Sequence, residues 1–290
     1  MLVLAAGGWQ AVLLPEAGAA FASLTRDGRD VLAPIPPGGD PNSARAGAFW
    51  MIPWSNRIED GRFRWSIGAE GEAGEREHRY PVNDLSGGNA IHGLAREHPW
   101  EMARSAPDSA RLVQRFAARD QPYRYEAVLE VSLTPAGLRL ALGVTNAAPT
   151  ILPFGFGWHP WFVRPEGTRL GFHATHRFAK DARNLLTEAL PSPGLEGGEA
   201  DWLGLDGHFA GWDGVARLEL GGAPLELRAE GAWAGNLQVY APRDKAVLCV
   251  EPVSHITNVL HRRALAPWGD MAWLAPEESL SASLTLAEAP

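Results

Sequence analysis

A glutamate that directly precedes proline is the first candidate for chemistry in this sequence. Glu251 ends the apolar run 246–250 and is followed by Pro252. A residue before proline favours extended backbone, so we expect a strand to reach Glu251 and to place its side chain on the face of Val247 and Cys249. A carboxyl group on an apolar face is costly unless it is paired or lines a cleft, where burial raises its pKa and suits it to act as a general base. The alternative is a strand-end glutamate turned towards solvent.

His159 has the same relation to proline and lies between the aromatic residues Trp158 and Trp161. The pKa of an imidazole in such surroundings is easily moved around neutrality, which suits a general acid. The alternative is a core histidine that is hydrogen-bonded to the backbone. His92 precedes Gly93, where we expect a bend in the backbone, and it is a weaker candidate for function.

Two further groups of polar residues are typical of polyol recognition. Arg57 follows Asn56 and lies near Trp54 in sequence, which combines fork-shaped donors, an amide and a flat ring. Gln238 and Tyr240 share one face of an expected strand. Either group could instead belong to an ordinary solvated surface.

Composition narrows the class of protein. The 290 residues carry 26 Lys and Arg against 34 Asp and Glu, a net charge of −8, and no basic run offsets it, so a nucleic-acid partner is not expected. The single cysteine, Cys249, excludes an intrachain disulfide framework, and its apolar neighbours favour a small buried side chain. The sequence lacks an apolar run long enough for a transmembrane helix, and its first residues do not make a convincing signal peptide. We expect a cytoplasmic monomer or homodimer without membrane contact.

Nine histidines require a check for metal sites. His173 and His176 could supply two ligands, but no acidic residue nearby completes a set. There is no H-E-x-x-H motif, no G-x-S-x-G motif and no phosphate-binding loop. The sequence therefore predicts neither a metal nor a cofactor.

Alternation with a period of two dominates the chain and predicts an all-β fold. Residues 125–133 and 138–144 alternate on either side of the turn 135–137, which indicates a β-hairpin. The best helical pattern is short, at Ala179–Leu190. No stretch is typical of a linker, so we expect one domain over residues 1–290, a large sandwich with few short helices. Further strands are expected at Trp9–Leu14, Arg111–Ala117, Ala216–Leu220, Leu225–Ala229, Leu237–Ala241, Ala246–Glu251 and Leu280–Leu286.

Taken in order, these polar segments resemble the aldose 1-epimerase (galactose mutarotase) family, and the similarity extends over nearly the whole chain. No single motif is decisive, but their joint order is specific. The segments are Asn56-Arg57-Ile58 with Gly61 and Phe63, His92-Gly93, His159-Pro160, Asp206 in the run 204–209, Gln238, and Glu251-Pro252.

The resemblance implies a galactose mutarotase-like supersandwich, a large antiparallel β-sandwich that holds a monosaccharide on its concave face. It implies that Glu251 takes the proton of the anomeric hydroxyl and that His159 protonates the ring oxygen. Arg57, His92, Asp206 and Gln238 would bind hydroxyl groups, and no cofactor or metal would be needed.

Departures from the family pattern leave alternatives open. Gly207 stands where the family often has histidine, and His208 follows one place later. A hexose-6-phosphate mutarotase, a non-catalytic sugar-binding domain and a hydrolase on a related sandwich are the other candidates. Hydrolysis normally needs two carboxylates, which disfavours the last of these. A phosphate usually needs several cationic donors, so we expect neutral aldoses to be preferred unless Arg62, Arg64 and Arg96 converge in the fold.

Overall fold

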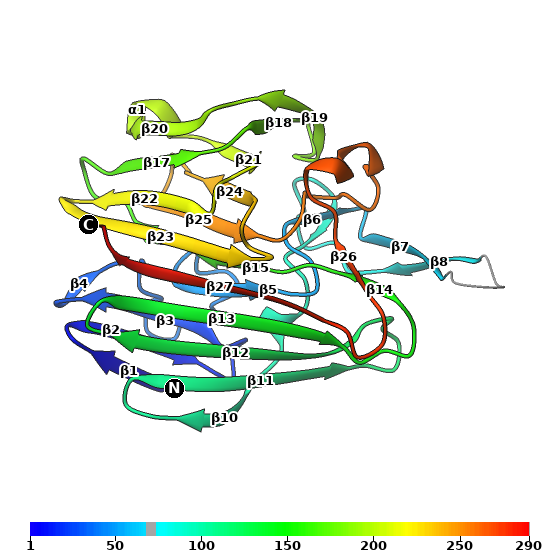
Figure 1. The fold of residues 1–290 in the computed structure, drawn as a ribbon, viewed down its shortest axis with the longest axis horizontal. Coiled ribbons are helices and arrows are strands. Elements are labelled where there is room, and N and C mark those ends of the chain that lie inside the picture. The colour runs from blue at the N-terminus through cyan, green and yellow to red at the C-terminus, as the bar shows by residue number, and fades with distance from the viewer. Residues whose placement is uncertain (68–73, 290) are drawn as a thin grey trace.

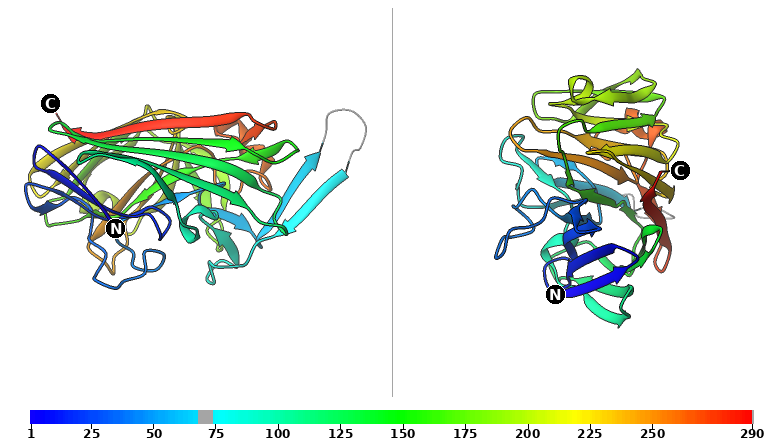
Figure 2. Two further views of the ribbon diagram at one scale, coloured as in Figure 1. Left: turned by 90° about the horizontal axis from the view of Figure 1, so that it is seen from below. Right: turned by 90° about the vertical axis from the view of Figure 1, so that its left-hand side faces the viewer.

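Two curved antiparallel sheets lie one behind the other in the computed structural model, which describes residues 1–67 and 74–289 (Figures 1 and 2). The 12-stranded sheet has the order β1 (Leu2–Ala6), β2 (Trp9–Leu14), β3 (Ala20–Arg26), β5 (Ala48–Met51), β15 (Gly157–Pro160), β25 (Val247–Val253), β24 (Asn236–Tyr240), β21 (Asp206–Ala210), β18 (His176–Lys180) and β19 (Leu186–Pro191). Two short strands, β4 (Arg29–Asp30) and β16 (Phe162–Val163), pair with β3 and β25.

The second sheet has nine strands and lies in front in Figure 1. Its order is β10 (Glu101–Ser105), β11 (Ser109–Ala117), β12 (Arg124–Thr134), β13 (Gly137–Asn146), β27 (Ser279–Glu288), β23 (Ala223–Gly231), β22 (Val215–Leu220), β17 (Arg169–His173) and β20 (Gly194–Gly198). Three two-stranded pairs complete the strands of the described residues. They are β14 (Leu152–Phe154) with β26 (Ala272–Leu274), β6 (Arg57–Glu59) with β9 (Asn89–Ile91), and β7 (Arg62–Ile67) with β8 (Gly74–Arg79). The described helices are short: α1 (Glu199–Trp202) and two 3-10 turns, Ala95–Glu97 and Arg263–Trp268.

The expected all-β sandwich is confirmed, and so is the hairpin, in which Leu133 of β12 pairs with Leu138 of β13. Each of the other expected strands overlaps a strand of the structure. The expected helix at Ala179–Leu190 is wrong, because this segment forms the end of β18, a turn and most of β19. The turn is built by Asp181, whose Oδ1 accepts the backbone N–H groups of Arg183 and Leu185 at 2.8 and 3.0 Å, and by Asn184 with a φ of +61°. Asp and Asn favour such local hydrogen bonds over a helix.

The apolar core between the sheets takes alternate residues from each strand. Leu248 and Val250 of β25 belong to it together with Leu140 of β13, whereas Cys249 belongs to a separate cluster. Successive side chains of a strand point to opposite faces. Cys249 and Glu251 therefore lie on the face of the large sheet that is turned away from the small one.

The described residues include no helix that is long and apolar enough to cross a membrane.

Candidate active site

Four neighbouring strands bring the proline-linked candidates together. In the large sheet β24, β25, β15 and β5 follow one another. Gln238 pairs with Glu251 between β24 and β25, and His159 pairs with Phe49 between β15 and β5. Residues directly opposite each other in an antiparallel pair project from the same face. Gln238, Glu251, His159 and Phe49 therefore form one row across the sheet.

His159 and Glu251 are in direct contact and almost completely buried. Nε2 of His159 lies 3.4 Å from Oε1 of Glu251, with 6% and 2% of the side-chain surfaces exposed. Neither Nδ1 of His159 nor Oε2 of Glu251 has a hydrogen-bond partner. The imidazole is stacked between Phe49 and Trp161, with ring centroids 4.5 and 4.9 Å away. The aromatic rings fix the imidazole beside the carboxyl group, and both polar groups keep unused hydrogen-bonding capacity.

The protonation of this pair follows from burial. Desolvation lowers the pKa of His159 to about 3, and the positive charge of Arg96 acts in the same direction. Desolvation raises the pKa of Glu251 well above its usual range, while Lys180 and Arg57 oppose that rise. Burial thus favours the neutral form of both groups, with a proton on Glu251 and none on His159. Moving that proton to His159 gives a carboxylate and an imidazolium without exchange with solvent.

Arg57 is held at the edge of the same pocket by two neighbours. Its Nε donates to Oδ2 of Asp84 at 2.8 Å, and its Nη1 donates to Oδ1 of Asn56 at 3.0 Å. Its Nη1 also lies 4.0 Å from Oδ2 of Asp206. Asn56 has a φ of +53°, a conformation that Asn tolerates better than most residues. This local turn brings the arginine and the amide to the pocket side by side.

Asp206 reaches the same pocket from the start of β21, where it pairs with Tyr240. Its Oδ1 accepts hydrogen bonds from Nε2 of Gln238 and from Nζ of Lys180, both at 2.6 Å. Oε1 of Gln238 is buried without a partner. His208, the neighbour that departs from the family pattern, lies opposite Gln238 in the strand pairing and has its Nε2 3.1 Å from Oδ1 of Asn236. His208 is buried and does not line the pocket.

His92 reaches the pocket from a backbone bend, as expected. Its φ is +70° and that of Gly93 is +68°. A Cβ at Gly93 would lie 2.2 Å from the carbonyl oxygen of Ile52, so this position requires glycine. Desolvation lowers the pKa of His92 well below its usual value, so the ring is neutral. Its centroid lies 5.1 Å from that of His159, and its Nδ1 is buried without a partner.

These side chains enclose a pocket of about 440 Å³. All seven residues singled out from the sequence line it: Asn56, Arg57, His92, His159, Asp206, Gln238 and Glu251. A cavity of this size accommodates a monosaccharide, and its many hydrogen-bonding groups suit a polyol. The structure thus brings the predicted site residues into one cavity, while their individual roles stay predictions.

Several residues of the site carry no signal in the sequence. Lys180 donates to Asp206, and Asp84 accepts a hydrogen bond from Arg57. In each pair the two residues come from different elements of the chain. Arg45 pairs with Asp244, with Nη1 2.7 Å from Oδ2, and lies over the ring of Trp161 at the pocket wall. These contacts depend on which non-consecutive strands become neighbours, which spacing along one sequence does not reveal.

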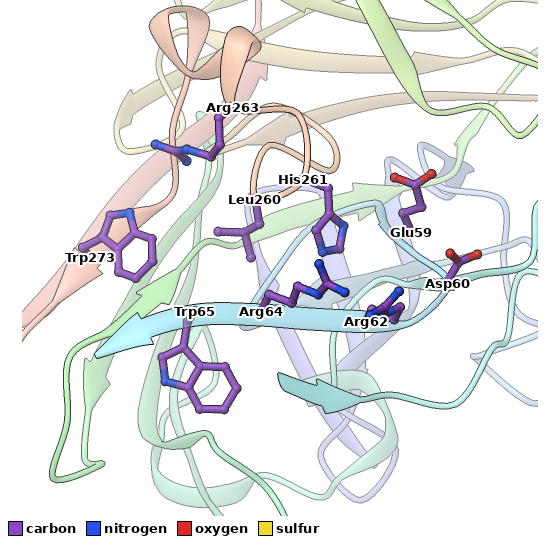
Figure 3. Close-up of a pocket in the computed structure, with 9 residues that line it drawn as sticks. All are labelled: Glu59, Asp60, Arg62, Arg64, Trp65, Leu260, His261, Arg263 and Trp273. Carbon is purple, nitrogen blue, oxygen red and sulfur yellow. The ribbon is translucent and has the colours of Figure 1, made fainter. Parts of the chain in front are cut away.

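The three arginines whose convergence would favour a phosphate separate into two places. Arg96 lines the pocket and lies over Phe49, 5.2 Å from the ring centroid, and its buried Nε has no hydrogen-bond partner. Arg62 and Arg64 instead line a different cavity of about 700 Å³, together with Trp65 and Trp273 (Figure 3). Both arginines are paired there with Glu77, at 2.8 and 2.9 Å.

Comparison with known proteins identifies the family. The sequence model of the family Aldose 1-epimerase matches residues 2–287. The chain is 30% identical over 257 residues to the uncharacterized protein YphB of Escherichia coli K12, a match that covers 83% of each chain. The chain belongs to the aldose 1-epimerase family.

Solved structures agree with this family at the level of the fold. A galactose mutarotase-like protein from Clostridium acetobutylicum has a TM-score of 0.81 at 20% identity, covering 98% of this chain and 93% of that chain. The GalM/aldose epimerase homologue from C. elegans has a TM-score of 0.74 at 18% identity, covering 99% and 98%. The supersandwich of the aldose 1-epimerase family is therefore the fold of this chain.

Proposed function

We propose that this protein is a mutarotase that interconverts the α and β anomers of a free aldose. The observation that carries the proposal is the buried contact of 3.4 Å between Nε2 of His159 and Oε1 of Glu251 at the wall of a polar, sugar-sized pocket. A site that only binds sugars does not need an acid–base pair taken out of water, since burying one is costly.

The reaction needs one proton acceptor and one proton donor. With the shared proton on His159, the carboxylate of Glu251 takes the proton from the anomeric hydroxyl. His159 protonates the ring oxygen as the bond between that oxygen and the anomeric carbon breaks, which leaves the open-chain aldehyde. Rotation about the C1–C2 bond presents the other carbonyl face. Reclosure returns the ring-oxygen proton to His159 and the Glu251 proton to the new anomeric hydroxyl, so the enzyme is restored.

The surrounding polar groups orient the sugar and favour the ionised pair. Arg57 and Lys180 are the cations whose charges oppose the rise in the pKa of Glu251, so they stabilise its carboxylate form. The unpartnered atoms of Gln238 and His92 and the carboxylate of Asp206 supply hydrogen-bonding positions for hydroxyl groups. Preorganised groups of this kind stabilise developing charge without reorganising during the reaction.

One observation favours a second candidate, a hexose-6-phosphate mutarotase. Arg96 lines the pocket with a buried Nε that has no partner, and an unpaired cation attracts an anionic substituent. Against this, Arg57 already pairs with Asp84 and Arg45 with Asp244. Among the described arginines of the pocket, Arg96 is then the one without a carboxylate partner, and it lies over Phe49, so we favour neutral aldoses.

Polarimetry on freshly dissolved α-D-glucose and α-D-galactose tests the proposal. We expect the purified protein to speed the approach to the anomeric equilibrium without changing the final rotation. Titration calorimetry with the same sugars separates the alternatives. Sugar binding without accelerated mutarotation would contradict the proposal and indicate a binding domain, and acceleration confined to glucose 6-phosphate would indicate the phosphosugar enzyme.

A further inference from the structure

Cys249 lies within reach of the pair of His159 and Glu251 although the proposed reaction does not use it. The thiol is free, and the residue is fully buried on the same strand face as Glu251, two residues earlier on β25. One ligand atom from each of Cys249, His159 and Glu251 lies within 4.8 Å of the other two. A thiol, an imidazole and a carboxyl group are the three side-chain types that bind zinc.

Two of these groups have polar atoms without hydrogen-bond partners. Glu251 and His159 are each more than nine-tenths buried, and Oε2 of the first and Nδ1 of the second lack a hydrogen-bond partner. Buried polar atoms without partners are rare in proteins and point to a group that is bound there. A sugar would meet this need during turnover. In its absence a cation between Oε1 of Glu251 and Nε2 of His159 would neutralise the carboxylate, while Nδ1 of His159, on the other side of the ring, would stay free.

The geometry suits a small tetrahedral ion. Zinc lies about 2.0–2.1 Å from nitrogen and oxygen ligands, so two such ligands at a tetrahedral angle are about 3.4 Å apart. Nε2 of His159 and Oε1 of Glu251 are separated by 3.4 Å. A thiolate about 2.3 Å from the ion belongs about 3.6 Å from the other ligands. The three ligand atoms lie within 4.8 Å of one another, so Sγ of Cys249 has to approach each of them by about 1.2 Å at most.

Charge balance supports the same choice of ion. A divalent cation bound by a thiolate and a carboxylate forms a neutral unit with the imidazole, which reduces the cost of placing it in a dry site. The soft thiolate favours Zn²⁺ or Cd²⁺ over Mg²⁺ and Ca²⁺, which prefer oxygen ligands. The fourth coordination position would face the pocket, because His159 and Glu251 both line it.

We propose that Cys249, His159 and Glu251 form a site for a thiophilic divalent cation, and that the bound cation blocks the sugar site. The ion would be bound by the carboxyl and imidazole groups that accept and donate protons in the proposed reaction. Sugar and metal would therefore compete for the site. The metal-binding part stands without the proposed function, whereas the inhibition rests on it. The cation would act as an inhibitor, since the proposed reaction uses no metal.

The substitution Cys249→Ala tests the site, because Cys249 handles no proton and touches no substrate in the proposed reaction. Co²⁺ added to the reduced wild-type protein should give the near-ultraviolet charge-transfer band of a cobalt–thiolate bond, and Cys249→Ala should not. Zn²⁺ should inhibit the wild type competitively with the sugar. The variant should keep its basal activity and need at least about tenfold more Zn²⁺ for half inhibition, a change of about 1.4 kcal/mol in binding free energy.

Three controls make the result specific. Mg²⁺ at the same concentrations should leave the wild type uninhibited. His173→Ala, which removes an exposed histidine outside the pocket, should leave the Zn²⁺ response unchanged. Cys249→Ser keeps the side-chain size and should also lose the cobalt band. A wild type without that band, or equal Zn²⁺ sensitivity in wild type and Cys249→Ala, would overturn the proposal. Since the cobalt spectrum needs no turnover, a protein without mutarotase activity would still give a clear answer.

Discussion

The cavity lined by Arg62 and Arg64 and the cavity lined by His159 and Glu251 differ in how their charges are satisfied. The cavity of about 700 Å³ has Glu59 and Asp60 on its wall, and both are paired with Arg183, at 3.3 and 2.6 Å. The cavity of about 440 Å³ contains Glu251, whose buried Oε2 has no partner, and the neighbouring Nδ1 of His159 has none either. The larger cavity also has unpartnered buried nitrogens, in Trp65 and His261, but Glu59 and Asp60 are paired. An unpaired buried carboxyl group is costly, so a protein keeps one where a ligand completes it. The smaller cavity is therefore the better candidate for chemistry, although the other has the greater volume.

The strongest test of this comparison replaces the carboxyl group in the smaller cavity. Glu251→Gln should lower kcat by about 10² or more, because the amide cannot accept the anomeric proton. The near-equal size of glutamine should leave the fold intact, as measured by circular dichroism and thermal unfolding. The rate is best measured by NMR exchange between the anomers.

A matched substitution in the larger cavity serves as the control. Asp60→Asn removes a carboxylate whose side chain is 52% exposed and should leave kcat unchanged. Near-full mutarotation by Glu251→Gln, or an equal loss in both variants, would remove the distinction between the cavities and the assignment of Glu251 as the base.

The second test separates proton donation from binding. His159→Asn should lower kcat by about tenfold to 10²-fold and raise KM less, because the proton reaches the ring oxygen mainly in the transition state. Steady-state kinetics on the preferred aldose give both constants. An effect on KM alone would make His159 a binding residue and His92, with its centroid 5.1 Å away, the better candidate for the acid.

The sequence predicted which residues share a face, and the fold was needed to show which of them meet. Alternation along 247–251 placed Cys249 and Glu251 together, and the strand order then added His159 from almost a hundred residues earlier. The family resemblance supplied this pairing as an expectation. The periodicity of the individual strands could not predict this pairing, because the register between non-consecutive strands is not encoded in local spacing.

The places where prediction failed have local or long-range causes. At 179–190 the apolar spacing suggested a helix, but the side chain of Asp181 and the positive φ of Asn184 build a tight turn instead. Lys180, at the end of the strand before that turn, donates to Asp206 and had no signal at all. A lysine at a strand end is usually solvated, so its burial became visible only with the neighbouring strand in place.

The third prediction concerns the charge of the substrate. The arginines at 62 and 64 belong to the larger cavity, and Arg96 alone among the three lines the smaller one. We expect kcat/KM to be higher for glucose or galactose than for glucose 6-phosphate, measured by polarimetry or NMR exchange. Arg96→Gln should then affect neutral and phosphorylated sugars alike. A tenfold advantage of the phosphate, about 1.4 kcal/mol, that Arg96→Gln abolishes would mean that one unpaired guanidinium suffices.

The smallest expected effect concerns a buried histidine that has all its partners, unlike His159. Nδ1 of His255 lies 2.9 Å from the carbonyl oxygen of Ile256 and must donate to it, while Nε2 accepts the N–H of Ser55 at 3.0 Å. The ring is therefore neutral and fixes the backbone that leads to the pocket residues 56 and 57. Desolvation lowers the pKa of His255 from 6.5 to about 4.

Acid should consequently weaken the fold through His255 as well as through the pocket. Between pH 6.5 and about 4 the unfolded chain binds a proton at this residue and the folded chain does not, so the free energy of unfolding falls as the pH falls. The contribution of one such group is at most about 1.4 kcal/mol per pH unit. His255→Gln keeps an acceptor for Ser55 but cannot titrate, so it should be less stable at pH 7 and should lose stability less steeply between pH 6 and 4. Urea unfolding at several pH values gives the free energy of unfolding against pH for the variant and the wild type. Equal slopes for the two proteins would show that His255 is not held neutral in the folded protein.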